Sequence, residues 1–332
     1  MNHNLRVVFI ATLFLGLVSQ VGCFAAASAS PSTNFVSPAS VIAAVKAAQS
    51  LTNLPSNLTP PLAQEGTGPI DFQDWGGDVL VSSKCVDLTT SMSRESYKDC
   101  YFGDLNSKFT VALVGDSRAE MVLDDFNNLG LDESFRVLYI AKDGCETPIA
   151  SYSLRSVSAS TLWKACVSFN DTMLLTLNAI KPQVIVISSA YQLDVTNPKP
   201  HQATPAEITA DFEKFLVKLP KKSKTLVLGG FPQPAPLYDP IQCLARNVSN
   251  ISKCDFVPPL SVRKDNAASK AATLKEHDVF LNLQPYFCAK TCPAVINNDI
   301  VYTGDAYHSG KTYLNYLMGT LWSMLKPAFT SR

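Results

Sequence analysis

The residues best suited to chemistry are Gly115, Asp116 and Ser117, which follow an apolar run at residues 109–114. A helical pattern begins directly after them. Gly115 permits a tight turn, and Ser117 then lies at a helix N-terminus, where backbone N–H groups stabilise a developing oxyanion. A serine placed in this way can attack the carbonyl carbon of an ester. The alternative is that Asp116 or Ser117 only caps the helix, because both residue types are preferred there.

A serine nucleophile needs a base, and His308 is the best candidate among the four histidines. It lies just before the last helical pattern of the chain. Asp305, three residues earlier, can reach the imidazole, fix its tautomer and stabilise the imidazolium. The Asp-x-x-His spacing also fits a capping loop, so its weight comes from the pairing with Ser117. We expect His201 and His277 to be ordinary surface residues.

The elements that must position these residues alternate along the chain. Short apolar, β-branched runs predict five strands, at residues 109–114, 136–140, 183–188, 224–228 and 278–283. Helical patterns follow them at residues 118–128, 170–180, 205–218, 262–276 and 310–325. Continuous apolar runs suit strands that are covered on both faces. The alternation predicts a three-layer α/β/α sandwich with a five-stranded parallel sheet, whose reactive groups gather at the carboxyl ends of the strands.

The N-terminus has the pattern of a secretory signal peptide, at residues 1–29. Arg6 precedes an apolar run at 7–18, and small residues at 25–29 supply a cleavage zone. The alternative is an uncleaved membrane anchor, although the apolar run is short for one. Cys23 faintly resembles a lipid attachment site. Residues 30–79 have the Pro- and Ser-rich composition of a linker, with one helical stretch at 41–51, and we expect the folded domain at 80–332.

Charge and cysteine content narrow the function classes. Lys plus Arg and Asp plus Glu both total 28, so no global field attracts nucleic acid. The chain has nine cysteines, and all except Cys23 lie beyond the signal segment. In an exported chain they favour disulfides, and their sequential clustering suggests local loops. Zinc is the competing interpretation, but the histidines are scattered and Cys288 and Cys292 have no second ligand pair nearby. We therefore expect neither a metal nor a cofactor.

These motifs together resemble the SGNH hydrolase superfamily, whose first block is Gly-Asp-Ser and whose last is Asp-x-x-His. The pattern is most similar to the SGNH domain that is fused to bacterial membrane O-acyltransferases acting on lipopolysaccharide, peptidoglycan and other glycans. The resemblance extends from about residue 80 to the end, and its carrying segments are 100–104, 111–117, 142–148, 166–170, 182–186 and 305–308. It implies a flavodoxin-like sandwich.

The resemblance also implies roles for individual residues. Ser117 is the expected nucleophile, with His308 as its base and Asp305 as the residue that orients His308. The Gly-x-Asn-Asp block of many SGNH esterases is absent, so the backbone N–H of Ser117, Gly144 and Gln192 are the candidate oxyanion donors. Arg118 stands where similar domains often carry histidine. The implied disulfide pairs are Cys85–Cys100, Cys145–Cys166, Cys243–Cys254 and Cys288–Cys292.

The function implied is that of an exported serine esterase or O-acyltransferase. Its substrate would be an acylated glycan of the cell envelope or a small ester, with acetyl as the expected acyl group. The fused domains receive acyl groups from membrane helices, so a separate membrane protein is a candidate acyl donor here. The alternative from another class is a catalytically inactive SGNH-fold protein that binds or assembles glycans.

Overall fold

The computed structural model describes residues 35–62, 74, 85, 100–148, 152–153, 159–190, 194–195, 201–202, 204–235, 238–305 and 307–329. The predicted signal peptide at 1–29, Cys23 and Gln192 lie outside these residues. Within them, no helix combines the length and apolar character that crossing a bilayer requires.

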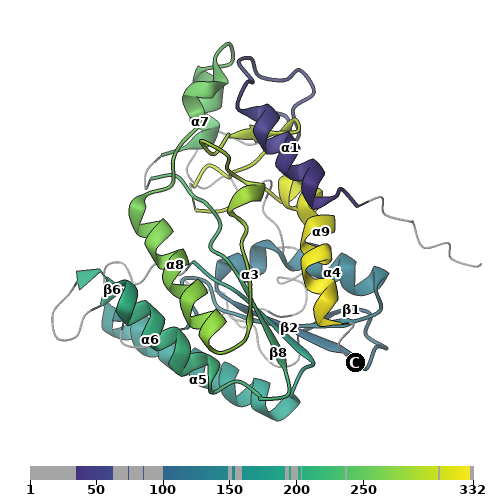
Figure 1. The fold of residues 1–332 in the computed structure, drawn as a ribbon, viewed down its shortest axis with the longest axis vertical. Coiled ribbons are helices and arrows are strands. Elements are labelled where there is room, and N and C mark those ends of the chain that lie inside the picture. The colour runs from purple at the N-terminus through teal and green to yellow at the C-terminus, as the bar shows by residue number, and fades with distance from the viewer. Residues whose placement is uncertain are drawn as a thin grey trace, which may run out of the picture. The chain divides into compact units, whose positions relative to one another are not determined.

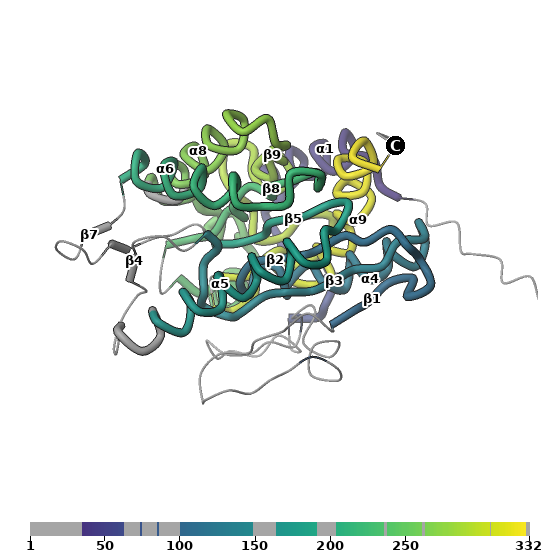
Figure 2. The backbone as a smooth tube through the Cα atoms, turned by 90° about the horizontal axis from the view of Figure 1, so that it is seen from below, coloured from purple at the N-terminus to yellow at the C-terminus, as the bar shows by residue number. Residues whose placement is uncertain are grey.

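The centre of the fold is a sheet with the strand order β1-β3-β2-β5-β8-β9. Figure 2 shows these strands side by side. Its strands are β1 (Tyr101–Gly103), β2 (Thr110–Gly115), β3 (Arg136–Ala141), β5 (Val184–Ser188), β8 (Lys224–Leu228) and β9 (Val279–Leu281). All neighbours run parallel except β1, which pairs antiparallel with β3. The five predicted strands and their parallel arrangement are thus confirmed. The short antiparallel edge strand β1 is an addition.

Both faces of the sheet are covered, because alternate residues of the central strand β2 enter different cores. Val111 and Leu113 belong to one buried cluster, whereas Ala112 and Val114 belong to the other. Side chains of a strand point alternately to its two faces, so each cluster marks one side of the sheet. The three-layer prediction is therefore confirmed.

Helices from separate parts of the chain form the two outer layers (Figure 1). The first core takes side chains from α1 (Pro38–Ala48), α3 (Ser117–Met121), α4 (Leu123–Asp132) and α9 (Lys311–Leu325). The second takes side chains from α5 (Ala159–Ile180), α6 (Pro205–Leu216) and α8 (Leu260–Lys275). The single helix predicted at 118–128 is instead two helices that break at Val122. The helix predicted at 170–180 begins earlier, at Ala159.

Short elements complete the described chain. They are the helix α7 (Pro240–Arg246), the 3₁₀ turns at Ile251–Cys254, Gln284–Tyr286 and Lys326–Ala328, and the strands β4 (Tyr152–Ser153), β6 (Asp194–Val195), β7 (His201–Gln202), β10 (Val295–Ile296) and β11 (Asp299–Ile300).

The N-terminal helix α1 packs on the domain. Val41, Val45 and Ala48 are at most 5% exposed and belong to the same core as α9. Asn34–Arg332 form one compact unit. The helical stretch expected within the linker is therefore present, but its apolar side packs in the core. The division at residues 79 and 80 stays a prediction.

Three disulfides close local loops within the described residues. They join Cys145 to Cys166, Cys243 to Cys254 and Cys288 to Cys292, with Cα–Cα distances of 5.2, 5.7 and 4.1 Å. These bonds agree with three of the predicted pairs, and the last of them bonds together the two cysteines weighed as zinc ligands. The Cys100 Sγ lies 3.8 Å from the carbonyl oxygen of Cys85, and a disulfide between these two residues stays a prediction.

Candidate active site

The turn that carries Ser117 is fixed by Gly115 and Asp116. Gly115 ends β2 with a φ of 153°, and a Cβ there would collide with the carbonyl oxygen of Ser188 and lie 2.8 Å from its carbonyl carbon. Only glycine allows β2 and β5 to approach this closely. Ser117 consequently emerges at the carboxyl edge of the sheet, as the first residue of α3.

Asp116, not Ser117, caps the helix. One carboxylate oxygen of Asp116 accepts the backbone N–H of Arg118 at 2.8 Å. The other accepts the hydroxyl of Ser189 and the backbone N–H of Ala190, each at 2.8 Å. Asp116 is therefore the residue that caps the helix, and the hydroxyl of Ser117 makes a different contact.

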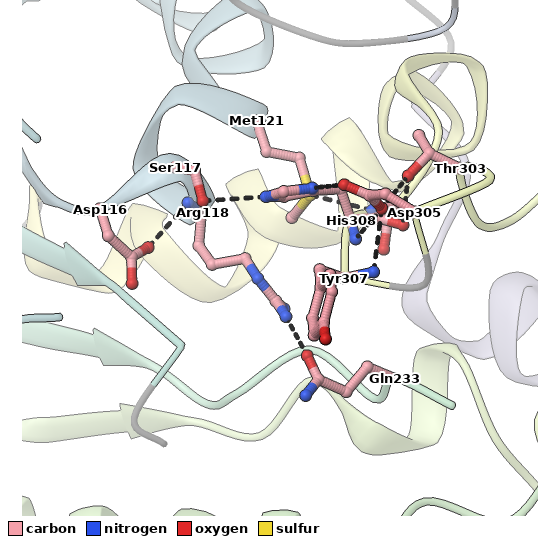
Figure 3. Close-up of polar contacts among 10 residues, drawn as sticks. Asp116, Ser117, Arg118, Met121, Gln233, Thr303, Asp305, Tyr307 and His308 are labelled. Atoms are coloured by element: carbon pink, nitrogen blue, oxygen red, sulfur yellow. Dashed lines mark hydrogen bonds and ion pairs between the residues drawn. The ribbon is translucent and has the colours of Figure 1, made fainter. Parts of the chain in front are cut away.

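That contact is His308. The Ser117 Oγ lies 2.8 Å from the His308 Nε2. The other ring nitrogen, Nδ1, is hydrogen-bonded to the Oδ2 of Asp305. Figure 3 shows the three side chains in one line, with the imidazole between the hydroxyl and the carboxylate. Two residues 191 positions apart in the chain therefore lie within hydrogen-bond distance of each other.

The second oxygen of Asp305 holds the loop in shape. It accepts the hydroxyl of Thr303 at 2.7 Å and the backbone N–H groups of Tyr307 and His308 at 2.9 and 3.1 Å. Thr303 is fully buried. These bonds fix the direction of the carboxylate, which in turn orients the imidazole.

The electrostatics of the pair suit proton transfer from a hydroxyl. Burial raises the pKa of Asp305, but its hydrogen bond and charge interaction with His308 and the bonds from Thr303 and Tyr307 outweigh that effect and hold the pKa at about 2. Burial lowers the pKa of His308 below its ordinary value, although Asp305 partly opposes this. A carboxylate therefore lies beside a neutral imidazole near pH 7, which is the state a general base requires.

The candidate oxyanion donors within the described residues are the backbone N–H of Ser117 and Gly144. Gly144 lies in an exposed turn after β3 with a φ of 68°, and its carbonyl oxygen is 4.0 Å from the Sγ of Cys166. Glycine adopts this backbone conformation without strain, so the turn by itself accounts for Gly144. The backbone N–H of Ser117 and Gly144 both stay predictions as oxyanion donors.

Sequence reasoning missed the residues that surround the side chains of Ser117, His308 and Asp305. Thr303 and Ser189 have no motif that marks them. Gln233 accepts a hydrogen bond from the guanidinium of Arg118, and both side chains are buried. Gln233 follows β8, so a search of every strand's carboxyl end would have included it. His277, expected at the surface, is exposed.

Among solved structures, the chain is similar to the periplasmic domain of a lipopolysaccharide acetyltransferase from Salmonella ser. Paratyphi A, with 12% identity, a TM-score of 0.47, and coverage of 68% of this chain and 85% of that one. It is also similar to the C-terminal catalytic domain of peptidoglycan O-acetyltransferase A from Streptococcus pneumoniae, with 14% identity, a TM-score of 0.37, and coverage of 67% and 95%.

Among curated proteins, none shows significant similarity to the chain. The family described as SGNH domain (fused to AT3 domains) matches residues 84–312, which include the Ser117 turn, the loop at 305–308 and the whole central sheet. The chain therefore belongs to the SGNH domain family that occurs fused to AT3 domains.

Proposed function

We propose that the chain is an exported serine esterase or O-acyltransferase that acts on acyl esters of cell-envelope carbohydrate. The observation that carries the proposal is the 2.8 Å contact between the Ser117 Oγ and the His308 Nε2, with Asp305 on the other ring nitrogen. A hydroxyl, an imidazole and a carboxylate in this order form the constellation of serine hydrolases, whatever the fold.

The first half-reaction transfers the acyl group to the protein. His308 Nε2 accepts the hydroxyl proton as the Ser117 Oγ bonds to the acyl carbon, and the negative charge moves to the carbonyl oxygen. The backbone N–H of Ser117 is the first candidate to stabilise that charge. The tetrahedral intermediate then collapses, the ester C–O bond breaks, and the imidazolium returns the proton to the departing alcohol.

The second half-reaction releases the acyl group. His308 takes a proton from water or from a sugar hydroxyl, whose oxygen attacks the acyl carbon. The tetrahedral intermediate then collapses, the bond to the Ser117 Oγ breaks, and the imidazolium returns the proton to that oxygen. Water gives a free acid and makes the protein an esterase. A sugar hydroxyl gives a new ester and makes it an O-acyltransferase. In both cases Asp305 supports the positive charge on the imidazole.

The proposed substrate and location rest on the family rather than on the site. Domains of this family occur fused to membrane acyltransferase domains, and the similar structures come from a lipopolysaccharide and a peptidoglycan acetyltransferase. We infer an acetylated glycan as substrate, export through the signal segment at residues 1–29, and a separate membrane protein as acyl donor in the transfer reaction. An inactive glycan-binding protein would not need the hydroxyl within hydrogen-bond reach of the imidazole.

Hydrolysis of p-nitrophenyl acetate tests the proposal. Wild type should release p-nitrophenol well above the buffer rate, and Ser117→Ala should not. Ser252→Ala, on an exposed serine of the 3₁₀ turn at Ile251–Cys254, is the matched control and should retain full activity. Equal rates in wild type and Ser117→Ala would reject the assignment. Adding an acceptor oligosaccharide then distinguishes free acetate from an acetylated sugar as the product.

A further inference from the structure

Arg118, the residue after the proposed nucleophile, is a buried cation with several anchors. Its side chain is 3% exposed. Its backbone N–H bonds to the carboxylate of Asp116, and its carbonyl accepts the Ser188 hydroxyl at 3.0 Å. Its guanidinium donates to the Oε1 of Gln233 and lies 5.9 Å from the ring centroid of Phe231. The turn after β2, the end of β5 and the loop after β8 thus converge on one residue, and the loop after β8 holds its guanidinium.

The guanidinium of Arg118 lies beside the side chains of Ser117, His308 and Asp305. Figure 3 shows the side chain of Arg118 running from the Ser117 turn past the imidazole to Gln233, with the Tyr307 ring next to it. The charged groups that influence His308 are Asp305 in its own loop, Asp116 at the end of β2 and Arg118 in α3. The two carboxylates favour a second proton on the imidazole, whereas the cation disfavours it.

The partner of Arg118 is suited to this arrangement. Glutamine is neutral, so the bond to Gln233 orients the guanidinium without cancelling its charge. A carboxylate in the same place would form an ion pair and weaken the field at the imidazole. Because both side chains are nearly dry, the field acts at an effective dielectric constant below that of water.

We propose that Arg118, held by Gln233, is a positioning residue of the site, whose positive charge adds to the effect of burial in keeping the imidazole of His308 in the neutral form that accepts the Ser117 proton. The catalytic part of this role rests on the proposed function. The effect of Arg118 on the charge of His308 does not, and it can be measured without any substrate.

The experiment follows the titration of His308 by NMR, through its imidazole C–H resonances assigned with His308→Gln. Arg118→Met should move the titration to higher pH. Gln233→Glu should move it in the same direction but less, and Arg118→Lys should leave it near that of wild type. The control is Arg136→Met, which removes a cation from the start of β3, at the opposite edge of the sheet. That variant should not move the titration.

The pH profile of p-nitrophenyl acetate hydrolysis gives the second readout. In Arg118→Met, the ratio of kcat/KM at about pH 8 to that at about pH 5 should rise about threefold or more over wild type. A merely structural role would lower activity by the same factor at every pH. Gln233→Glu is nearly isosteric, so it serves if Arg118→Met does not fold.

The outcomes separate the two proposals. An unchanged His308 titration in both Arg118→Met and Gln233→Glu overturns the role of Arg118, whatever the activity. A shifted titration in these variants, together with a wild type that hydrolyses no ester, supports the effect of Arg118 on His308 and rejects the proposed function. A shifted titration with an unshifted rate profile rejects the catalytic part of the role.

Discussion

Replacing Asp305 with asparagine is the change that best isolates the electrostatic part of the site. The asparagine side chain would be nearly isosteric and would keep one oxygen for Thr303 and for the backbone N–H groups of Tyr307 and His308. What changes is the group that faces the imidazole, because an amide N–H has to replace a carboxylate oxygen there. The Nδ1 of His308 must then accept a hydrogen bond from this amide, so the ring proton moves from Nδ1 to Nε2. As a result, Nε2 can no longer accept the Ser117 proton.

The expected cost in stability is moderate. A carboxyl pKa that falls from 3.8 to about 2 on folding corresponds to about 2 kcal/mol of stabilisation. Because the folded pKa is the lower one, this stabilisation is present above pH 3.8 and is lost as the pH falls toward 2. The side chain is only 13% exposed, so solvent screens little of it. Asp305→Asn should therefore lower the Tm by no more than about 6 °C.

The expected cost in activity is far larger. The corresponding change lowers kcat by about 10⁴-fold in the best-studied serine triad, and we expect a loss of this order here. His308→Ala should be at least as damaging, because the proton acceptor is gone. The assay is p-nitrophenyl acetate hydrolysis per folded molecule, with thermal unfolding measured on the same samples. If Asp305→Asn unfolds the protein while turnover per folded molecule is unchanged, Asp305 is a structural cap and the reasoning is wrong.

Four further predictions test the surroundings of the site and of the fold. Gly115→Ala places a Cβ against the backbone at the end of β5 and should cost about 2–4 kcal/mol in unfolding free energy along with most of the activity; chemical denaturation and the ester assay measure both. Asp116→Ala leaves three donors, two of them buried, without their acceptor and should cost about 3 kcal/mol, which urea unfolding will register. Burial and the charge of Asp74 raise the pKa of Asp299 to about 7, so its ionisation opposes folding from about pH 4 upward. Asp299→Asn should therefore raise stability at about pH 8 by about 4 kcal/mol and leave it unchanged below about pH 4, as unfolding curves across this range will show. Finally, kcat/KM should fall at acid pH as His308 gains a proton, with its midpoint below 6.5, because burial lowers that pKa; a midpoint above 6.5 in the rate profile would contradict this.

The fold was predictable where the chain buries continuous apolar runs. Each of β2, β3, β5 and β8 has at least four residues with buried side chains, a pattern that only a doubly covered strand explains well. The edge strand β1 has three residues, too few for any periodicity to mark it. The break of the predicted helix at Val122 also has no local signal, since neither proline nor glycine lies there.

The site was predictable where its residues lie in motifs at strand ends. Ser117 could be placed because it follows β2 at the carboxyl edge of the parallel sheet. His308 lies beyond β11, outside that sheet, so only the Asp-x-x-His motif before the last helix pointed to it. The supporting contacts of Thr303, Ser189 and Gln233 join loops whose shapes depend on tertiary packing. Serine, threonine and glutamine are common in loops, so their presence alone carries no information on such bonds.

Trapping an acyl-enzyme tests the central claim most directly. The protein would be mixed with p-nitrophenyl acetate, quenched with acid at short times, and digested for mass spectrometry. The account predicts an acetyl group on the peptide that contains Ser117 in wild type, none in Ser117→Ala, and far slower labelling in His308→Ala. An acetyl group on another residue, together with p-nitrophenol release by Ser117→Ala at the wild-type rate, would contradict it.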